Sequence, residues 1–136
     1  MVDRIGWLAI PILFVLFAPG NADAQASTDQ VVRWGKMATL APLCGLRDEA
    51  WSFDLRRAEL QGATGSKRFD DKALRSAPGS NEAVAALSYA ETEALEGFAE
   101  TPPERTCLPL SGNPDLLEAD DIVRAFRAQR ERQPGS

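Results

Sequence analysis

The chain has 136 residues, of which 44% are hydrophobic and 26% are charged, and this composition predicts one globular domain with a single core. Its formal net charge is −5, so it lacks the excess of lysine and arginine that binding to nucleic acid or to an anionic membrane surface requires. It contains no histidine, which removes the commonest general base, metal ligand and pH-sensitive side chain.

Residues 1–26 have the three parts of a secretory signal peptide. Arg4 is followed by an apolar run over 5–18 and then by small residues, with cleavage expected after Ala24 or Ala26. The alternative is a retained membrane anchor, but this run would reach only about 21 Å as a helix against about 30 Å of hydrocarbon. We therefore expect cleavage, export to the periplasm or the medium, and no membrane attachment afterwards.

The two cysteines, Cys44 and Cys107, have no other possible partners and lie 63 positions apart. A disulfide persists in the oxidising compartments that exported proteins reach. Closing a loop of this length stabilises a chain by roughly 4 kcal/mol in the chain-entropy model. We predict that the two residues form one disulfide.

The first helix is predicted from Thr28 to the neighbourhood of Pro42, which lacks an N–H and restricts the residue before it. Gly45 can then take the left-handed conformation that ends many helices. Its inward face is formed by apolar residues at helical spacing: Val31, Trp34, Met37, Ala38 and Ala41.

The second helix, over 49–61, is apolar on two sides. Trp51 and Leu55 lie on one stripe, whereas Phe53 and Leu60 lie on nearly the opposite side. One interpretation is that this helix is central and buried on both sides, which we favour because most such residues in small bundles belong to the core. The other is that Phe53 and Leu60 form an interaction face for a partner.

A short helix is predicted over 70–77, with Asp70 as its N-cap and Phe69 packing against Leu74. The adjacent acids Asp70 and Asp71 resemble a metal or acid–base pair. Two acids in the first turn of a helix more often serve as cap and dipole partner, and we interpret them in that way.

The longest helix is predicted over 81–100, with Ser80 as its N-cap. Glu91 lies within its apolar stripe, so it is a candidate buried acid. We prefer an ion pair with an arginine; a solvated edge of the stripe and a functional acid are the alternatives. The possible arginine partners are Arg33, Arg47, Arg56 and Arg57, and the stripe consists of Val84, Leu87, Ala94, Leu95 and Phe98.

Prolines 102 and 103 end this helix, and Cys107 is predicted to lie in an irregular loop that Pro109 and Gly112 maintain. Asn113 is expected to cap a last helix from Pro114 to Arg130, followed by a disordered tail over 131–136. The fold class predicted for 27–130 is all-α, a bundle of four main helices and one short helix stapled by one disulfide. No alternating strand pattern is present in the sequence.

The sequence contains no redox Cys-x-x-Cys pair, no phosphate-binding glycine loop and no nucleophile with a plausible base. A two-acid hydrolase using Glu91 is compatible with the sequence, but about 110 residues leave little room for a substrate cleft beside a core. We therefore predict a non-enzyme with no catalytic residues, no cofactor and no metal.

Two functions fit these features. The first is a monomeric exported protein-interaction module, such as an inhibitor, adaptor or assembly factor, with a protein partner that the sequence does not identify. The second is a bundle that binds a small ligand in an internal pocket, lined by Glu91, Trp34, Trp51 and Phe98.

Overall fold

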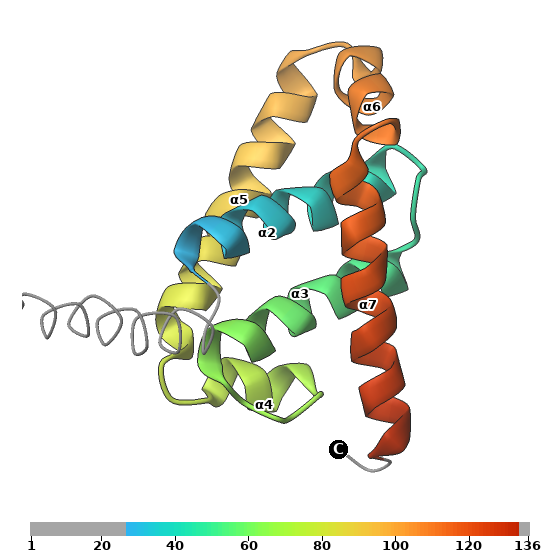
Figure 1. Cartoon of the computed structure of the whole chain (residues 1–136). Helices are drawn as coiled ribbons and strands as arrows, with labels where there is room; N and C mark the ends of the chain where they lie inside the picture. Colours follow the sequence, from blue (N-terminus) through green and yellow to red (C-terminus); the bar gives the residue numbers. More distant parts are fainter. Residues whose placement is uncertain (1–26, 134–136) are drawn as a thin grey trace, which may run out of the picture.

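The computed structural model describes residues 27–133, and over this range the regular structure is entirely helical (Figure 1). The predicted all-α bundle with one disulfide is confirmed. The helices are α2 (Thr28–Leu43), α3 (Glu49–Thr64), α4 (Asp71–Ser76), α5 (Ser80–Glu100), α6 (Pro103–Ser111) and α7 (Pro114–Arg132). The predicted signal peptide lies outside the described residues, as do the last three residues of the predicted tail.

Local sequence signals set the ends of the first two helices. Ser27 and Gln30 form a capping box at the start of α2, each side chain bonding the backbone N–H of the other residue. Asp48 caps α3 by accepting from the N–H of Trp51 at 2.8 Å. α3 continues beyond the predicted stop at residue 62, because the left-handed residue that ends it is Gly65, with φ of 75°.

The start of α5 differs from the prediction. Ser80 is the first helical residue and not the cap; its hydroxyl donates to the carbonyl of Arg75 at 2.6 Å. The preceding residue, Gly79, adopts φ of 81° and supplies the turn out of α4.

The segment that carries Cys107 is a helix, α6, so the predicted irregular loop is wrong. Pro103 occupies the first turn, where a missing N–H costs nothing, and Pro109 falls near the end of a helix of nine residues. α6 brings Cys107 to Cys44 at the end of α2, with a Cα–Cα distance of 5.5 Å, and the predicted disulfide is confirmed.

Two apolar clusters form the core. The first joins α2 from Trp34 onward, α6, and the N-terminal halves of α3 and α7. α7 crosses the ends of α2 and α3 (Figure 1). The second joins the other ends of α2 and α3 to α4 and α5. The first contains Trp34, Met37, Ala38, Ala41, Trp51, Leu55, Leu110, Leu116, Ala119 and Val123; the second contains Val31, Leu60, Leu74, Ala83, Ala86 and Leu87.

Small residues let α2 and α5 approach closely. A Cβ added to Gly35 would lie 2.8 Å from the Cβ of Ala90, which is closer than two carbon atoms can pack, and 3.2 Å from Leu87, which is a tight contact. α5 therefore turns its small residues toward α2. Its buried face shares Leu87 and Ala94 with the predicted stripe, but Val84 and Phe98 are only partly buried. This face consists of Ala83, Ala86, Leu87, Ala90 and Ala94.

This rotation of α5 places Glu91 on the surface, so the prediction that it is a buried acid is wrong. The preferred ion pair with an arginine is not formed within residues 27–133, and the alternative of a solvated edge of the stripe agrees with the exposure of Glu91. Leu95, which belonged to the predicted stripe, is 45% exposed for the same reason. None of the helices within residues 27–133 combines the length and the hydropathy that crossing a membrane would require.

Candidate functional site

The two residues of the predicted interaction face have different environments. Leu60 is fully buried in the second core cluster, whereas the ring of Phe53 is 51% exposed. The two side chains therefore do not share one exposed face. The favoured interpretation, in which both are core residues, is correct for Leu60 and wrong for Phe53. Only Phe53 is available to a partner.

Phe53 instead shares a surface hollow with Glu91. The hollow has a volume of about 280 Å³ and lies where α3, α4 and α5 meet. We call it the arginine hollow; its lining consists of Phe53, Arg56, Arg57, Asp71, Arg75 and Glu91.

Arg56 is the cation of the arginine hollow that lacks a carboxylate partner among the described residues. Its side chain is half-buried, and it donates to the hydroxyl oxygens of Ser52 at 2.7 Å and Thr39 at 3.1 Å. Burial lowers the pKa of Arg56, an effect that Glu91 and Glu49 oppose and Arg75 reinforces. An arginine stays protonated despite such a shift, so this site holds a poorly solvated positive charge.

The other two arginines of the hollow are paired. Arg75 donates from Nε to Asp71 at 2.8 Å, one turn earlier in α4. Arg57 donates to Asp54 at 3.0 Å, and its guanidinium carbon lies 6.0 Å from the centre of the Phe53 ring. These contacts hold both groups at the rim beside the exposed ring, within the range of a cation–π interaction for Arg57.

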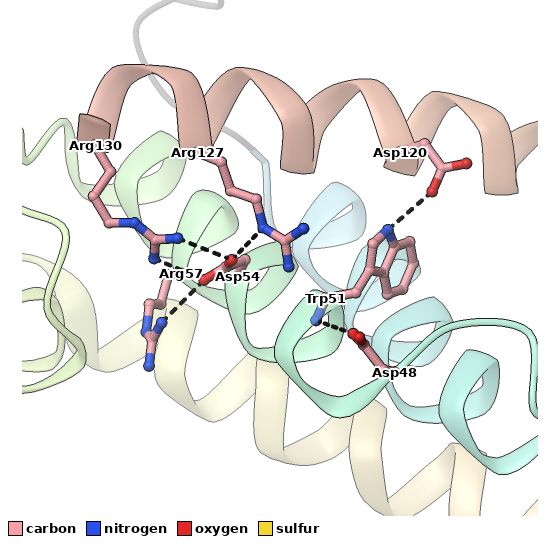
Figure 2. Close-up of polar contacts among 7 residues, drawn as sticks. All are labelled: Asp48, Trp51, Asp54, Arg57, Asp120, Arg127 and Arg130. Atoms are coloured by element: carbon pink, nitrogen blue, oxygen red, sulfur yellow. Dashed lines mark hydrogen bonds and ion pairs between the residues drawn. The ribbon is translucent and has the colours of Figure 1, made fainter. Parts of the chain in front are cut away.

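Three arginines, one of which is Arg57 of the hollow, surround the carboxylate of Asp54 (Figure 2). Asp54 is only 4% exposed; besides Arg57, it accepts from Arg127 at 2.6 Å and from Arg130 at 3.1 Å, both on α7. Burial alone would raise the pKa of Asp54, but the hydrogen bonds and the positive charges of Arg127 and Arg130 together outweigh it and lower the pKa. The cluster fixes α7 on α3.

A second polar contact joins the same two helices. The indole Nε1 of Trp51 donates to Asp120 at 2.9 Å, as Figure 2 shows, and Arg47 donates to both oxygens of the same carboxylate. The hydrogen bonds from Arg47 and then Trp51 lower the pKa of Asp120 against the opposing effect of burial. Trp51 and Trp34 belong to the first core cluster, so they do not form an internal pocket with the exposed Glu91.

A second buried acid on α3, besides Asp54, is Glu59, which is 7% exposed. No hydrogen bond or ion pair joins its carboxylate to the part of the chain that the structure describes. Burial raises the pKa of Glu59 to about 7.

Sequence reasoning missed the arginine hollow, Asp54 and Glu59. On a helical wheel Asp54 and Glu59 flank the stripe of Trp51 and Leu55, so their places beside the core could have been noticed. The hollow could not have been predicted from the sequence, because it depends on how α4 and α5 cross α3.

Residues 27–133 contain no cluster of three or more acidic or cysteine side chains placed to hold a metal ion. Comparisons of the chain with protein-family models, with curated proteins and with solved structures found no match.

Proposed function

We propose that this protein is an exported, non-catalytic protein-interaction module and that the arginine hollow is its docking surface. The observation that carries the proposal is the pairing of an exposed aromatic ring, Phe53, with the half-buried cation Arg56, which has no carboxylate partner in the described chain. Aromatic residues and arginine are enriched in protein interfaces, and arginine is enriched among the few residues that dominate the binding energy.

Export is supported by the disulfide, because such a bond persists in oxidising compartments. The disulfide also fixes the two ends of the segment from which the hollow is built, since α3, α4 and α5 all lie between Cys44 and Cys107. A surface held in shape before binding loses less entropy when a partner docks.

Site-specific photocrosslinking in the native cell tests this function. A photoreactive phenylalanine replaces Phe53, and in a control chain it replaces Tyr89, an exposed aromatic residue on α5 outside the hollow. We expect one discrete protein adduct from position 53 and none of the same mass from position 89. Equal adducts from both positions, or no adduct from position 53, would contradict a docking role for the hollow.

A further inference from the structure

We propose that the arginine hollow recognises a single carboxylate, supplied by an aspartate or glutamate side chain that the partner presents next to an apolar residue. This inference rests on the proposed docking function and names the chemistry of the partner. Arg56 binds the carboxylate, and the Phe53 ring contacts the apolar residue beside it.

Arg56 is prepared for an anion. A guanidinium has five N–H donors in a fixed plane, and two of those of Arg56 are directed at the hydroxyls of Ser52 and Thr39. The remaining donors have no hydrogen-bond partner within residues 27–133. The two hydroxyl contacts fix the plane of the group, so a carboxylate that docks on it meets a donor set that is already oriented.

The charges around the hollow favour a monoanion. Its lining carries three guanidinium groups, from Arg56, Arg57 and Arg75, against the two carboxylates of Asp71 and Glu91. Arg75 is paired with Asp71 and Arg57 with Asp54, so Arg56 is the guanidinium of the lining without a paired carboxylate within residues 27–133, and a single carboxylate from a partner would neutralise it. A phosphate dianion would bring a second negative charge close to Asp71 and Glu91, into a protein whose net charge is already −5.

Glu91 acts as an internal competitor. It lies close enough to Arg56 to oppose the lowering of its pKa, yet it forms no ion pair with it. An incoming carboxylate experiences repulsion from Glu91 while it binds Arg56. Removing the charge of Glu91 should therefore strengthen binding, which is the opposite of what a generally weakened site would show.

The test is an NMR titration of the mature, oxidised protein with N-acetyl-glutamate N-methylamide, observing the Arg56 Nε–H and Phe53 ring signals. The glutamine analogue of this probe and inorganic phosphate are titrated in parallel. We expect saturable shifts with the glutamate probe, little response to the glutamine probe, and weaker binding of phosphate.

Two variants with opposite expected effects make the test specific. Glu91→Gln should tighten binding of the glutamate probe by about fivefold, and Arg56→Gln should abolish it. Arg105→Gln removes the same charge from the exposed surface of α6 and should have no effect. If Arg56→Gln unfolds the chain, the increase in affinity for the glutamate probe expected from Glu91→Gln still tests whether the hollow binds a carboxylate.

Three results would overturn the inference: equal shifts from the glutamate and glutamine probes, tighter binding of phosphate, or unchanged affinity in Glu91→Gln. If carboxylate binding fails while photocrosslinking at position 53 succeeds, only this inference is wrong and the docking function stands. If the probe binds but position 53 gives no protein adduct, the carboxylate site stands and the protein partner is wrong.

Discussion

Arg127 donates from Nε to Oδ2 of Asp54 at 2.6 Å, across 73 positions of sequence. Arg130 reaches the same carboxylate from the next turn of α7. A charged contact thus anchors the C-terminal half of α7, where Phe126 is the one fully inward-facing apolar residue, packed edge to face on Phe69 with ring centres 5.4 Å apart.

Replacing Asp54 with asparagine should lower the free energy of unfolding by about 2 to 3 kcal/mol, because the three guanidinium groups would lose their counter-charge. This loss of stability is smaller than the loss expected for a fully buried ion pair. The reason is that Arg127 and Arg130 are about 40% exposed and keep part of their hydration. Urea unfolding at pH 7 measures it. Asp121→Asn, which breaks the exposed pair with Arg124, is the matched control and should change nothing measurable.

Asp54 and Asp120, the two carboxylates that join α7 to the rest of the fold, predict a loss of stability in acid. Because the folded-state pKa values of Asp54 and Asp120 are lowered, the stability they supply is complete above the unfolded value of about 3.9 and is lost as the pH falls below it. Asp54→Asn should lose less stability than the wild type between pH 4 and pH 2. If the free energy of unfolding fell equally with pH in the two proteins, Asp54 would not be a source of the acid-induced loss.

Glu59 predicts that the free energy of unfolding changes with pH in the opposite direction. Its folded-state pKa is about 7, so between the unfolded value of about 4.3 and pH 7 the folded chain holds more protons, and stability should fall as the pH rises through this window. Glu59→Gln should match the wild type at pH 4 and exceed it by about 2 to 3 kcal/mol at pH 8. Urea unfolding from pH 4 to pH 8 measures both, with the exposed Glu96→Gln as control; an unchanged slope in Glu59→Gln would rule out this assignment.

Gly35→Ala should destabilise the protein by about 1 kcal/mol, since the cost of overpacking against Ala90 exceeds the gain in helix propensity. Gly97→Ala is the matched control, because a Cβ there meets nothing within 4 Å in α5 and should stabilise the chain by up to about 1 kcal/mol. Thermal unfolding should therefore shift in opposite directions for the two variants. A stabilising Gly35→Ala would mean that α2 and α5 do not pack this closely.

Cys44→Ser and Cys107→Ser should each lower stability to a similar extent, by as much as about 4 kcal/mol, because either change opens the same covalent loop. Melting temperatures of both variants, and of the wild type with and without reductant, provide the measurement. Unequal losses in the two variants would show that one cysteine contributes by packing as well as by the crosslink.

The sequence was sufficient for the helices whose signals are local. Asp48, Asp70 and Asn113 cap α3, α4 and α7 as predicted, and two cysteines allow only one pairing. The error at α6 has a local cause as well. We treated Pro109 as a residue that keeps a segment irregular, whereas near the end of a helix a proline removes only one backbone hydrogen bond.

The error at α5 came from packing between helices. Periodicity favours the side of α5 with the larger apolar residues, but α5 approaches α2 closely at Gly35 and Ala90, where small side chains let the backbones come together. Which side of a helix packs closest depends on the size of the residues that the neighbouring helix places at the contact. The sequence pattern of one helix alone does not contain that information. The rotation of α5 exposes Glu91 and places it in the lining of the arginine hollow.

The bond between Cys44 and Cys107 makes the middle of the chain a covalent ring from which α2 and α7 extend as two arms. The exposed basic residues Lys67 and Arg68 lie inside this ring, between α3 and α4. A protease that cleaves after either residue would therefore not release a fragment; the nicked protein would keep its full mass until the disulfide was reduced. Both arms pack into the same apolar cluster, so a single cut in the ring leaves them in contact as well as covalently joined.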